Sequence, residues 1–301
     1  MHQRLAPASY AHVGKRSEKT EAGDHRFRFA LNSMALGLIV CGVGGRMGAA
    51  VVRAAKQTPG VEVFAAIDRP GSSRLGKDAG EISAAGPLGV RISDEIEPRL
   101  KPNTVIIDFT RPEAALDCLR TASKKAVPIV IGTTGFSATQ SAEIKKLSRH
   151  TPVLLSANMS LGINLLMGLL GKAAAVLGEG YDVEILEAHH RFKRDAPSGT
   201  ALALGRSVAD ALGRDLERVG IHGRKGIVGE RSKKEIALLS VRAGDIVGEH
   251  TVIFGGIGER IEFIHRAHSR DTFARGAIRA ARWLAKQKKG LYSMQDVLGL
   301  K

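Results

Sequence analysis

The chain has 301 residues, 44% hydrophobic and 25% charged, values that fit a folded protein with a buried core and exclude a disordered chain. The net charge of +15 favours anionic partners such as nucleic acid, a phosphorylated cofactor or a carboxylate substrate. Three Tyr and one Trp are too few for a nucleic-acid surface built on aromatic stacking. Glycine, with 35 residues and no collagen repeat, is expected at turns and where backbone approaches a ligand.

Residues 1–33 carry mixed charges without helical or strand periodicity, and we predict a flexible extension ahead of Met34. No apolar signal-peptide core precedes Met34, and the acidic residues there argue against an organelle transit peptide. Two cysteines, Cys41 and Cys118, cannot form a disulfide framework and suit a reducing, cytoplasmic location. The apolar stretch 161–178 contains an Asn and a Lys, so we interpret it as a core helix and expect no membrane span.

From Leu36 onward, short apolar runs alternate with helical segments. Continuous apolar strands between helices predict a parallel sheet covered on both faces. The predicted strands are 36–41, 61–67, 104–109, 128–131 and 153–156, and the predicted helices are about 46–57 and 139–148. Between them, Thr110-Arg111-Pro112-Glu113 predicts a further helix that starts with a capping box and a proline in its first turn.

After Asn158 the pattern changes to helices followed by a run of strands, which predicts an α+β second domain. We predict helices at about 160–177 and from Ser198, strands at 182–188, 235–241, 247–254 and 260–265, and a final amphipathic helix at 272–285. The segment 214–234, rich in Gly, Arg and Lys, is predicted to be a mobile basic loop. Residues 34–159 and 270–301 are thus expected to form one domain, and residues 160–269 the other.

A glycine-rich turn, Gly42-Val43-Gly44-Gly45-Arg46-Met47-Gly48, joins the first strand to the first helix. Such a turn lets backbone amides and a helix N-terminus contact a pyrophosphate, although Met47 holds the place of the last glycine in the usual pattern. Arg46 is either a phosphate contact or a solvated helix residue. Asp68 ends the second strand, where an acid suits a ribose 2′-hydroxyl, and the adjacent Arg69 suits a 2′-phosphate. The sequence therefore predicts a dinucleotide site with loose discrimination between NAD and NADP.

Two later segments, Gly132-Thr133-Thr134-Gly135 and Ser156-Ala157-Asn158-Met159, also follow apolar strands. Ligands bind at the carboxyl ends of parallel strands, so these segments either line the nicotinamide or are ordinary turns. Asp108 lies within an apolar strand, and we expect it to have a structural role.

The segment 187–200 carries the acid–base chemistry. His189 and His190 end a strand, three further cations follow within four residues, and histidine is the side chain best suited to move protons near neutral pH. Lys193 is expected to donate a proton or clamp a carboxylate. Ser198-Gly199-Thr200 opens a helix whose amides suit a second anionic group. Together these residues predict a site for a small dianion, and a metal is disfavoured because no suitably spaced Cys or carboxylates complete the histidine pair.

The chain resembles the dihydrodipicolinate reductase family, also called 4-hydroxy-tetrahydrodipicolinate reductase, from about Met34 to the C-terminus. The segments that carry the resemblance are GVGGRMG at 42–48, DFTRPEA at 108–114, IGTTGF at 131–136, EAHHRFKRDAPSGTA at 187–201 and VRAGDIVGEHT at 241–251. The resemblance implies a Rossmann-type domain, a mixed-sheet substrate and oligomerisation domain, and NADH- or NADPH-dependent reduction of a cyclic dicarboxylate in lysine and diaminopimelate biosynthesis. It also implies a homotetramer.

Carried onto this chain, the resemblance implies that residues 42–47 hold the pyrophosphate and that Asp68 and Arg69 contact the ribose end. It implies that Gly132, Thr133, Thr134, Ser156, Ala157, Asn158 and Met159 flank the nicotinamide. His189 would be the proton donor or acceptor, Lys193 a second proton donor, and His190, Gly199 and Thr200 would bind substrate carboxylate.

The chain departs from the family pattern at three positions, with Asp68 in place of Glu, Phe192 in place of His and Met159 in place of Phe. The sequence is also compatible with two other functions. One is another Rossmann-type reductase, similar to aspartate or homoserine dehydrogenase. The other is a non-catalytic nucleotide-sensing regulator that binds nucleic acid, which the few aromatic residues and the lack of a helix-turn-helix pattern disfavour.

Overall fold

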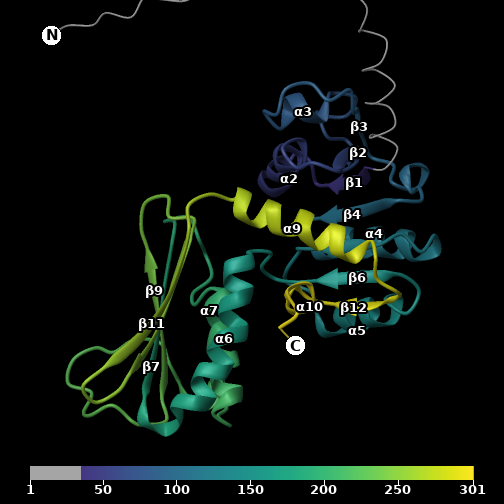
Figure 1. Ribbon diagram of the computed structural model, residues 1–301. Coiled ribbons are helices and arrows are strands. Elements are labelled where there is room, and N and C mark those ends of the chain that lie inside the picture. Colours follow the sequence, from purple (N-terminus) through teal and green to yellow (C-terminus); the bar gives the residue numbers. More distant parts are fainter. Residues whose placement is uncertain (1–34, 301) are drawn as a thin grey trace, which may run out of the picture. The chain divides into compact units, whose positions relative to one another are not determined.

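The computed structural model describes residues 35–300, and the extension predicted at 1–33 lies outside them. The segments Met1–Ala35 and Leu36–Lys301 are separate units, and the second is described below. Its first sheet is parallel and has the strand order β12-β6-β5-β4-β1-β2-β3 (Figure 1). The strands are β1 (Leu36–Cys41), β2 (Val61–Ile67), β3 (Ile92–Ser93), β4 (Thr104–Asp108), β5 (Ile129–Ile131), β6 (Pro152–Leu155) and β12 (Gly290–Tyr292).

All six residues of β1 are buried, because helices cover both faces of this sheet. Leu38 and Val40 pack on the face covered by α2, α9 and α10, whereas Ile39 and Cys41 pack on the face covered by α4 and α5. The helices are α2 (Arg46–Lys56), α3 (Ala79–Ile82), α4 (Pro112–Lys124), α5 (Ala138–Leu147), α9 (Asp271–Leu284) and α10 (Met294–Leu298), with a 3-10 turn η1 at Glu97–Arg99. The predicted alternation of apolar strands and helices is confirmed.

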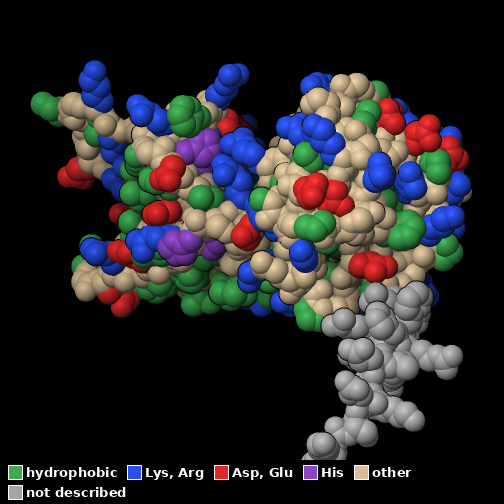
Figure 2. Space-filling view, turned by 90° about the horizontal axis from the view of Figure 1, so that it is seen from above, with side chains coloured by type: hydrophobic (Ala, Val, Ile, Leu, Met, Phe, Trp, Pro, Cys, Tyr) green, Lys and Arg blue, Asp and Glu red, His purple; other side chains and the backbone are tan. Residues whose placement is uncertain are grey.

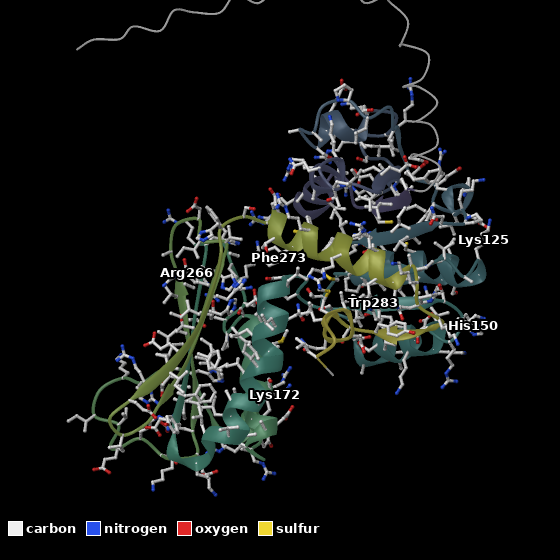
Figure 3. All side chains as sticks on the ribbon, viewed as in Figure 1. Lys125, His150, Lys172, Arg266, Phe273 and Trp283 are labelled. Atoms are coloured by element: carbon white, nitrogen blue, oxygen red, sulfur yellow. The ribbon has the colours of Figure 1, made fainter. Side chains whose placement is uncertain are left out.

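The C-terminal segment returns to the first sheet. Helix α9 is amphipathic, and its buried side contributes Ala277, Ile278 and Leu284 to the core. Trp283, labelled in Figure 3, packs edge to face against Tyr292 of β12 with 5.2 Å between ring centroids. Strand β12 then pairs with β6 in parallel. Strand β12 follows the second sheet in the sequence but completes the first sheet.

The second sheet has the order β11-β10-β7-β9-β8. It is mixed, because β7 pairs antiparallel with β10 but parallel with β9. Helices α6 and α7 supply the apolar residues that cover one face. The elements are α6 (Leu161–Leu177), η2 (Gly178–Gly180), β7 (Asp182–His189), α7 (Gly199–Ala211), α8 (Leu216–Val219), β8 (Gly220–Ile221), β9 (Ile236–Arg242), β10 (Gly248–Gly255) and β11 (Arg260–Ala267).

The apolar helix predicted at 160–177 is α6, which begins after Ser160, whose hydroxyl accepts from the Ile163 amide. It buries Ile163, Leu166 and Leu170, while Leu165 and Leu169 are exposed. Among the described residues, Leu161–Gly180 is the stretch long and apolar enough to cross a membrane by length and composition. The helix packs one side in the protein core and leaves an apolar side uncovered.

The predicted capping box at Thr110 is wrong. Pro112 does begin α4, but the N-cap is Arg111, which makes no side-chain capping bond. The Thr110 hydroxyl instead donates to Oδ1 of Asp108 at 2.8 Å. The hydroxyl is drawn away from the helix because the buried carboxylate next to it needs donors.

The segment 214–234 was predicted as a mobile basic loop, and this is wrong at its start, whereas residues 222–234 form no helix or strand. It contains α8 and β8. Arg231 bonds Glu184 of β7 at 3.0 Å, and Arg224 bonds Glu235 at 2.6 Å. Arg224 and Arg231 are thus bound by carboxylates outside the segment, which a count of local charge does not show.

Candidate active site

The glycine turn brings the N-terminus of α2 to the carboxyl end of β1. Gly42 has φ +72°, a left-handed backbone that favours glycine. The amides of Gly42 and Val43 both donate to the carbonyl of Ile67, at 2.8 and 3.1 Å, which ties the turn to β2. A Cβ on Gly48 would lie 2.2 Å from the Gly42 carbonyl oxygen. Gly48 thus provides the close helix–strand approach expected of the displaced last glycine.

A cavity of about 580 Å³ opens beside this turn. Gly42, Gly45, Asp68 and Arg69, four of the residues predicted to contact a dinucleotide, line it. Asp68 accepts hydrogen bonds from the Ser72 hydroxyl at 2.8 Å and from the Arg69 amide at 2.9 Å. The cavity also has walls that the sequence did not indicate, formed by Pro70, Asp94, Ile96, Phe109, Thr110, Arg111 and Glu113.

Two arginines near the turn were missed. Arg74 lies 3.9 Å from the Asp68 carboxylate, and its side chain would touch a Cβ placed on Gly44. Arg270, the residue before α9, has its pKa lowered by burial and by the positive charge of Arg46. The Gly-Ser-Ser-Arg run after the second strand could have indicated Arg74, whereas Arg270 lies 224 positions from Arg46 and had no local signal.

The carboxyl ends of β4 and β5 meet at Asp108. Its Oδ1 accepts from the hydroxyls of Thr110 and Thr133, each at 2.8 Å, and from the Thr110 amide at 3.0 Å. Burial raises the pKa of Asp108, although these bonds act against the rise. The Phe109 ring fills the space where a Gly132 side chain would lie. Gly132, Thr133 and Thr134 line neither of the cavities described for residues 35–300.

The end of β6 meets the start of α7. Asn158 donates from Nδ2 to the Thr200 hydroxyl at 3.0 Å, so a predicted cofactor segment and a predicted substrate segment are in direct contact. Ser156, Ala157, Asn158, Gly199 and Thr200 line a cavity of about 450 Å³. Met159 is different, since its side chain is buried in the core of the first sheet.

The predicted proton-transfer residue His189 ends β7 beside a buried carboxylate. Nδ1 of His189 lies 2.5 Å from Oε2 of Glu187. The guanidinium group of Arg242, on β9, donates hydrogen bonds to both carboxylate oxygens of Glu187, at 2.7 and 2.8 Å. Burial alone would raise the pKa of Glu187, but hydrogen bonds from Arg242, His189 and Ser240 lower it to about 2. Glu187 is therefore an anion at neutral pH that fixes the histidine ring.

The pKa of His189 is lowered, chiefly by burial and against the pull of Glu187. The ring is therefore uncharged at neutral pH. With Nδ1 occupied by the carboxylate, Nε2 is the nitrogen left for a ligand. A dianion next to this ring would favour its protonated form, which couples substrate binding to proton uptake.

His250 supports this arrangement from β10. It is 3% exposed, it packs edge to face on His189 with 5.3 Å between centroids, and its Nε2 lies 3.2 Å from the Ser198 hydroxyl. Burial, followed by the nearby His189, lowers the pKa of His250 to about 3. Ser198 in turn caps α7 by accepting from the Ala201 amide. These contacts give His250 a structural role.

Lys193 and His190, which follow the end of β7, differ in their hydrogen-bond partners. Lys193 bonds both carboxylate oxygens of Asp195 at 2.8 Å, and its side chain is mostly covered. Nδ1 of His190 is buried and has no hydrogen-bond partner within residues 35–300. On the face shown in Figure 2, histidine side chains lie beside Lys and Arg side chains. A polar atom left without a partner among cations suits an anionic ligand.

Comparison with known proteins gives one consistent result. Residues 36–159 match the model of the dihydrodipicolinate reductase N-terminus, and residues 162–298 match that of its C-terminus. The chain belongs to the dihydrodipicolinate reductase family. Family relatives named 4-hydroxy-tetrahydrodipicolinate reductase include one from Syntrophus aciditrophicus, 52% identical over 87% of this chain and 98% of its own, and one from Thiobacillus denitrificans, 51% identical over 89% and 100%.

Solved structures support the same fold. Dihydrodipicolinate reductase from Paenisporosarcina sp. TG-14, determined with dipicolinate bound, aligns with a TM-score of 0.69 at 24% identity and covers 87% of this chain and 99% of its own. This dihydrodipicolinate reductase family member is thus an oxidoreductase with a Rossmann-type domain, a nicotinamide cofactor and a small-molecule substrate.

Proposed function

We propose that this chain reduces 4-hydroxy-tetrahydrodipicolinate to tetrahydrodipicolinate with loss of water, in lysine and diaminopimelate biosynthesis. Relatives about 50% identical over most of the chain carry this activity in their names. The observation that carries the proposal is the Glu187–His189–Arg242 group at the end of β7, in which a buried carboxylate bound by Arg242 holds the histidine ring. The family match favours this reductase over both rival functions.

The residues of the glycine turn fit a dinucleotide. The turn presents the N-terminus of α2, and Gly48 allows an approach that any side chain would block. When bound, the nicotinamide cofactor supplies the hydride. We assign the pyrophosphate to residues 42–47 and the ribose end to Asp68 and Arg69. Gly132–Thr134 and Ser156–Met159 are assigned to the nicotinamide side.

We assign proton transfer to His189. Glu187 orients the ring through Nδ1, so Nε2 is available to hold a proton that the substrate ring takes up. Because burial lowers the pKa of His189, the imidazole gives up such a proton readily. The anchored carboxylate also stabilises the imidazolium that forms when the dianion binds.

The substrate carboxylates are assigned to the start of α7 and the segment before it. Gly199 and Thr200 open α7, where a helix N-terminus favours an anion. His190 offers an unpartnered ring nitrogen, and Lys193 offers a charge that Asp195 now neutralises. In this proposal Lys193 exchanges Asp195 for a substrate carboxylate and serves as the second proton donor.

Both NADH and NADPH are proposed as cofactors. Asp68 suits the 2′-hydroxyl of NADH, whereas Arg69 and Arg74 can pair with the 2′-phosphate of NADPH. Arg74 lies close enough to Asp68 to offset the charge that would otherwise repel a phosphate. Removing Arg74 should therefore affect the two cofactors unequally.

We also propose an oligomeric state, a division into domains and a compartment. We propose a homotetramer that forms through the face of the second sheet left uncovered by α6 and α7. Val241 and Ile264 are 48% and 47% exposed there, which is large for apolar strand residues. Residues 34–159 with 270–301 are proposed as the cofactor domain and residues 160–269 as the substrate and oligomerisation domain. A cytoplasmic location suits the two free cysteines.

The test is a reductase assay with enzymatically generated 4-hydroxy-tetrahydrodipicolinate, run with NADH and NADPH side by side. Both cofactors should be consumed in a substrate-dependent way. Arg74→Ala should lower kcat/KM for NADPH about tenfold, the loss of one charged contact, and change that for NADH little. Lys77→Ala, an exposed cation on the same loop, is the matched control. Absence of substrate-dependent oxidation contradicts the proposed reaction, and equal losses with both cofactors contradict the role of Arg74.

A further inference from the structure

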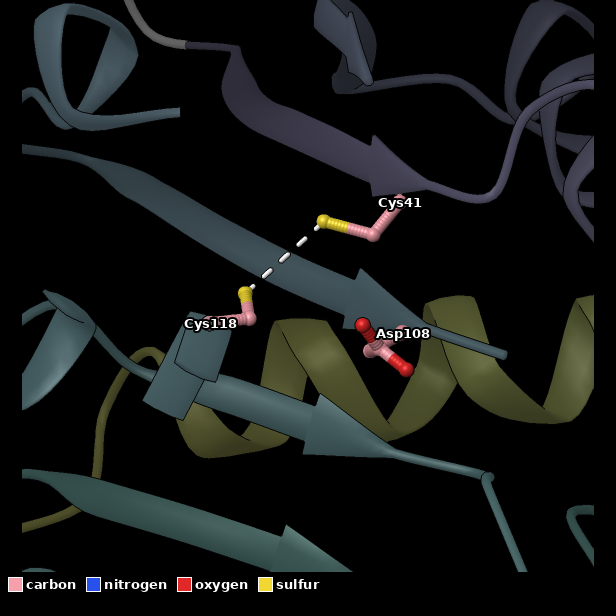
Figure 4. Close-up of side chains that lie close together, drawn as sticks. All are labelled: Cys41, Asp108 and Cys118. Atoms are coloured by element: carbon pink, nitrogen blue, oxygen red, sulfur yellow. Dashed lines mark hydrogen bonds between the residues drawn. The ribbon is translucent and has the colours of Figure 1, made fainter. Parts of the chain in front are cut away.

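Two cysteines and an aspartate that the proposed reaction does not use lie together in the first sheet. Cys41 is the last residue of β1, Asp108 the last of β4, and Cys118 lies on α4 (Figure 4). Their sulfur and oxygen atoms lie within 4.8 Å of one another, and all three residues are buried. The chain positions are up to 77 residues apart, so no local spacing indicates this cluster.

The cluster holds a carboxylate without a cation. Asp108 is 1% exposed and accepts only from Thr110 and Thr133, all at Oδ1. Within residues 35–300, Oδ2 receives no hydrogen bond and no Lys, Arg or His forms an ion pair with Asp108. A buried carboxylate in that position is stabilised by a nearby positive charge. The raised pKa of Asp108 agrees with the lack of a positive charge beside it.

The sulfur geometry fits a particular class of cation. Sγ of Cys41 and Sγ of Cys118 are 3.8 Å apart. In a tetrahedral site with metal–sulfur bonds of about 2.3 Å, two sulfurs are separated by about 3.8 Å. A disulfide would require the sulfurs to move to about 2.0 Å. Two thiolates with one carboxylate select thiophilic divalent ions such as Zn²⁺ over Mg²⁺ or Ca²⁺.

An entry path exists. Cys41, Asp108 and Cys118 all line the cavity of about 580 Å³ beside the glycine turn. An ion can therefore reach the cluster without the sheet opening, and a water from the cavity can complete a fourth position.

We propose that Cys41, Cys118 and Asp108 form a binding site for a thiophilic divalent cation of the zinc class. Binding releases the two thiol protons to solvent, so the site passes from one negative charge, on Asp108, to a dication held by two thiolates and a carboxylate.

The test is titration of the full chain with Cd²⁺ under reducing conditions, followed by the ultraviolet thiolate-to-metal charge-transfer band. We expect one equivalent of Cd²⁺ per chain, displaced by Zn²⁺ and not by Mg²⁺. Cys41→Ser and Cys118→Ser should each weaken binding by about a hundredfold or more, since loss of even an outer-sphere partner costs about 10–100-fold. Asp108→Asn should weaken it about tenfold and keep the band.

Asp117→Asn is the matched control, because Asp117 lies beside Cys118 on α4 and lines the same cavity. It should bind Cd²⁺ as the unchanged chain does. Circular dichroism of each variant checks that the fold is kept. If a serine variant misfolds, the thiols of the unchanged chain are alkylated instead and the Cd²⁺ titration is repeated, which should abolish the band. Absence of the band, or an undiminished band in folded Cys41→Ser, overturns the proposal.

Discussion

Two buried carboxylates at strand ends, Glu187 in the second sheet and Asp108 in the first, have opposite environments. Arg242 binds both oxygens of Glu187 and His189 bonds it as well, and its pKa is lowered to about 2. Asp108 has only neutral donors, and its pKa is raised. Burial disfavours both ions, so the surrounding charge decides the sign of each shift.

Glu187 is an anion held by positive charge, whereas Asp108 is a buried carboxyl group with no positive charge paired to it. Glu187 is charged over the whole neutral range and can hold His189 in one orientation for proton transfer. Asp108 organises the ends of β4 and β5 through two threonines but lacks a charge partner. The same residue class thus holds a histidine ring in one sheet and organises two strand ends in the other.

Removing the anchor should have the largest effect on stability. Glu187→Gln leaves the partly covered Arg242 without its anion, and breaking such a pair typically costs about 3–5 kcal/mol. We expect the free energy of unfolding to fall by about 3 kcal/mol, since Arg242 keeps some contact with water. Urea unfolding at pH 7 and one fixed protein concentration measures it, and a loss below about 1 kcal/mol contradicts the anchoring role.

The pH dependence of stability tests the histidine beside the anchor. The pKa of His250 is lowered from an ordinary 6.5 to about 3 in the folded chain. Between these two pH values the unfolded chain therefore binds a proton at His250 and the folded chain does not. Stability is therefore lost as pH falls from 6.5 toward 3. Two pH units below 6.5, this loss amounts to about 2.7 kcal/mol at about 1.4 kcal/mol per unit.

His250→Asn removes this titration. Between pH 7 and about pH 4.5, its unfolding free energy should fall by about 2–3 kcal/mol less than that of the unchanged chain. His222→Asn, at an exposed position, is the control and should follow the unchanged chain. If the free energy of unfolding of His250→Asn and of the unchanged chain falls equally with pH, the lowered pKa of His250 is contradicted.

Asp108→Asn should have the smallest effect. The amide oxygen can still accept from Thr110 and Thr133, and no cation partner is left unpaired. We expect a change within about 1 kcal/mol at pH 7, measured as for Glu187→Gln. A loss as large as that of Glu187→Gln would show that Asp108 has a charge partner after all and would remove the contrast.

Much of the fold could be predicted because its strands and helices have hydrophobic patterns within short stretches of sequence. Continuous apolar runs identified the strands of the first sheet, and the glycine turn identified the start of α2 within one residue. Strand β12 was missed because three residues of Gly-Leu-Tyr carry no period and pair only with β6. The capping box at Thr110 failed because a buried carboxylate competed for the hydroxyl.

The sequence indicated residue types for the candidate site but not the side chains that contact them. His189 and Lys193 were indicated by a local cluster of cations, and the resemblance supplied their roles. Arg242, which holds Glu187, lies 55 residues away, and its contact arises only from the parallel pairing of β7 and β9. Arg270 was missed because its interaction with Arg46 arises only on folding, whereas the Gly-Ser-Ser-Arg run near Asp68 offered a local signal for Arg74.

The most direct test of the central claim is the turnover of His189→Gln. The claim is that His189, held by Glu187, transfers the proton while the glycine turn holds the cofactor. The variant should lower kcat with 4-hydroxy-tetrahydrodipicolinate by about 10²–10⁴, the range for loss of a general acid or base, and leave the Kd for NADH unchanged in a nicotinamide fluorescence titration. Unchanged turnover in a folded His189→Gln protein would contradict the account.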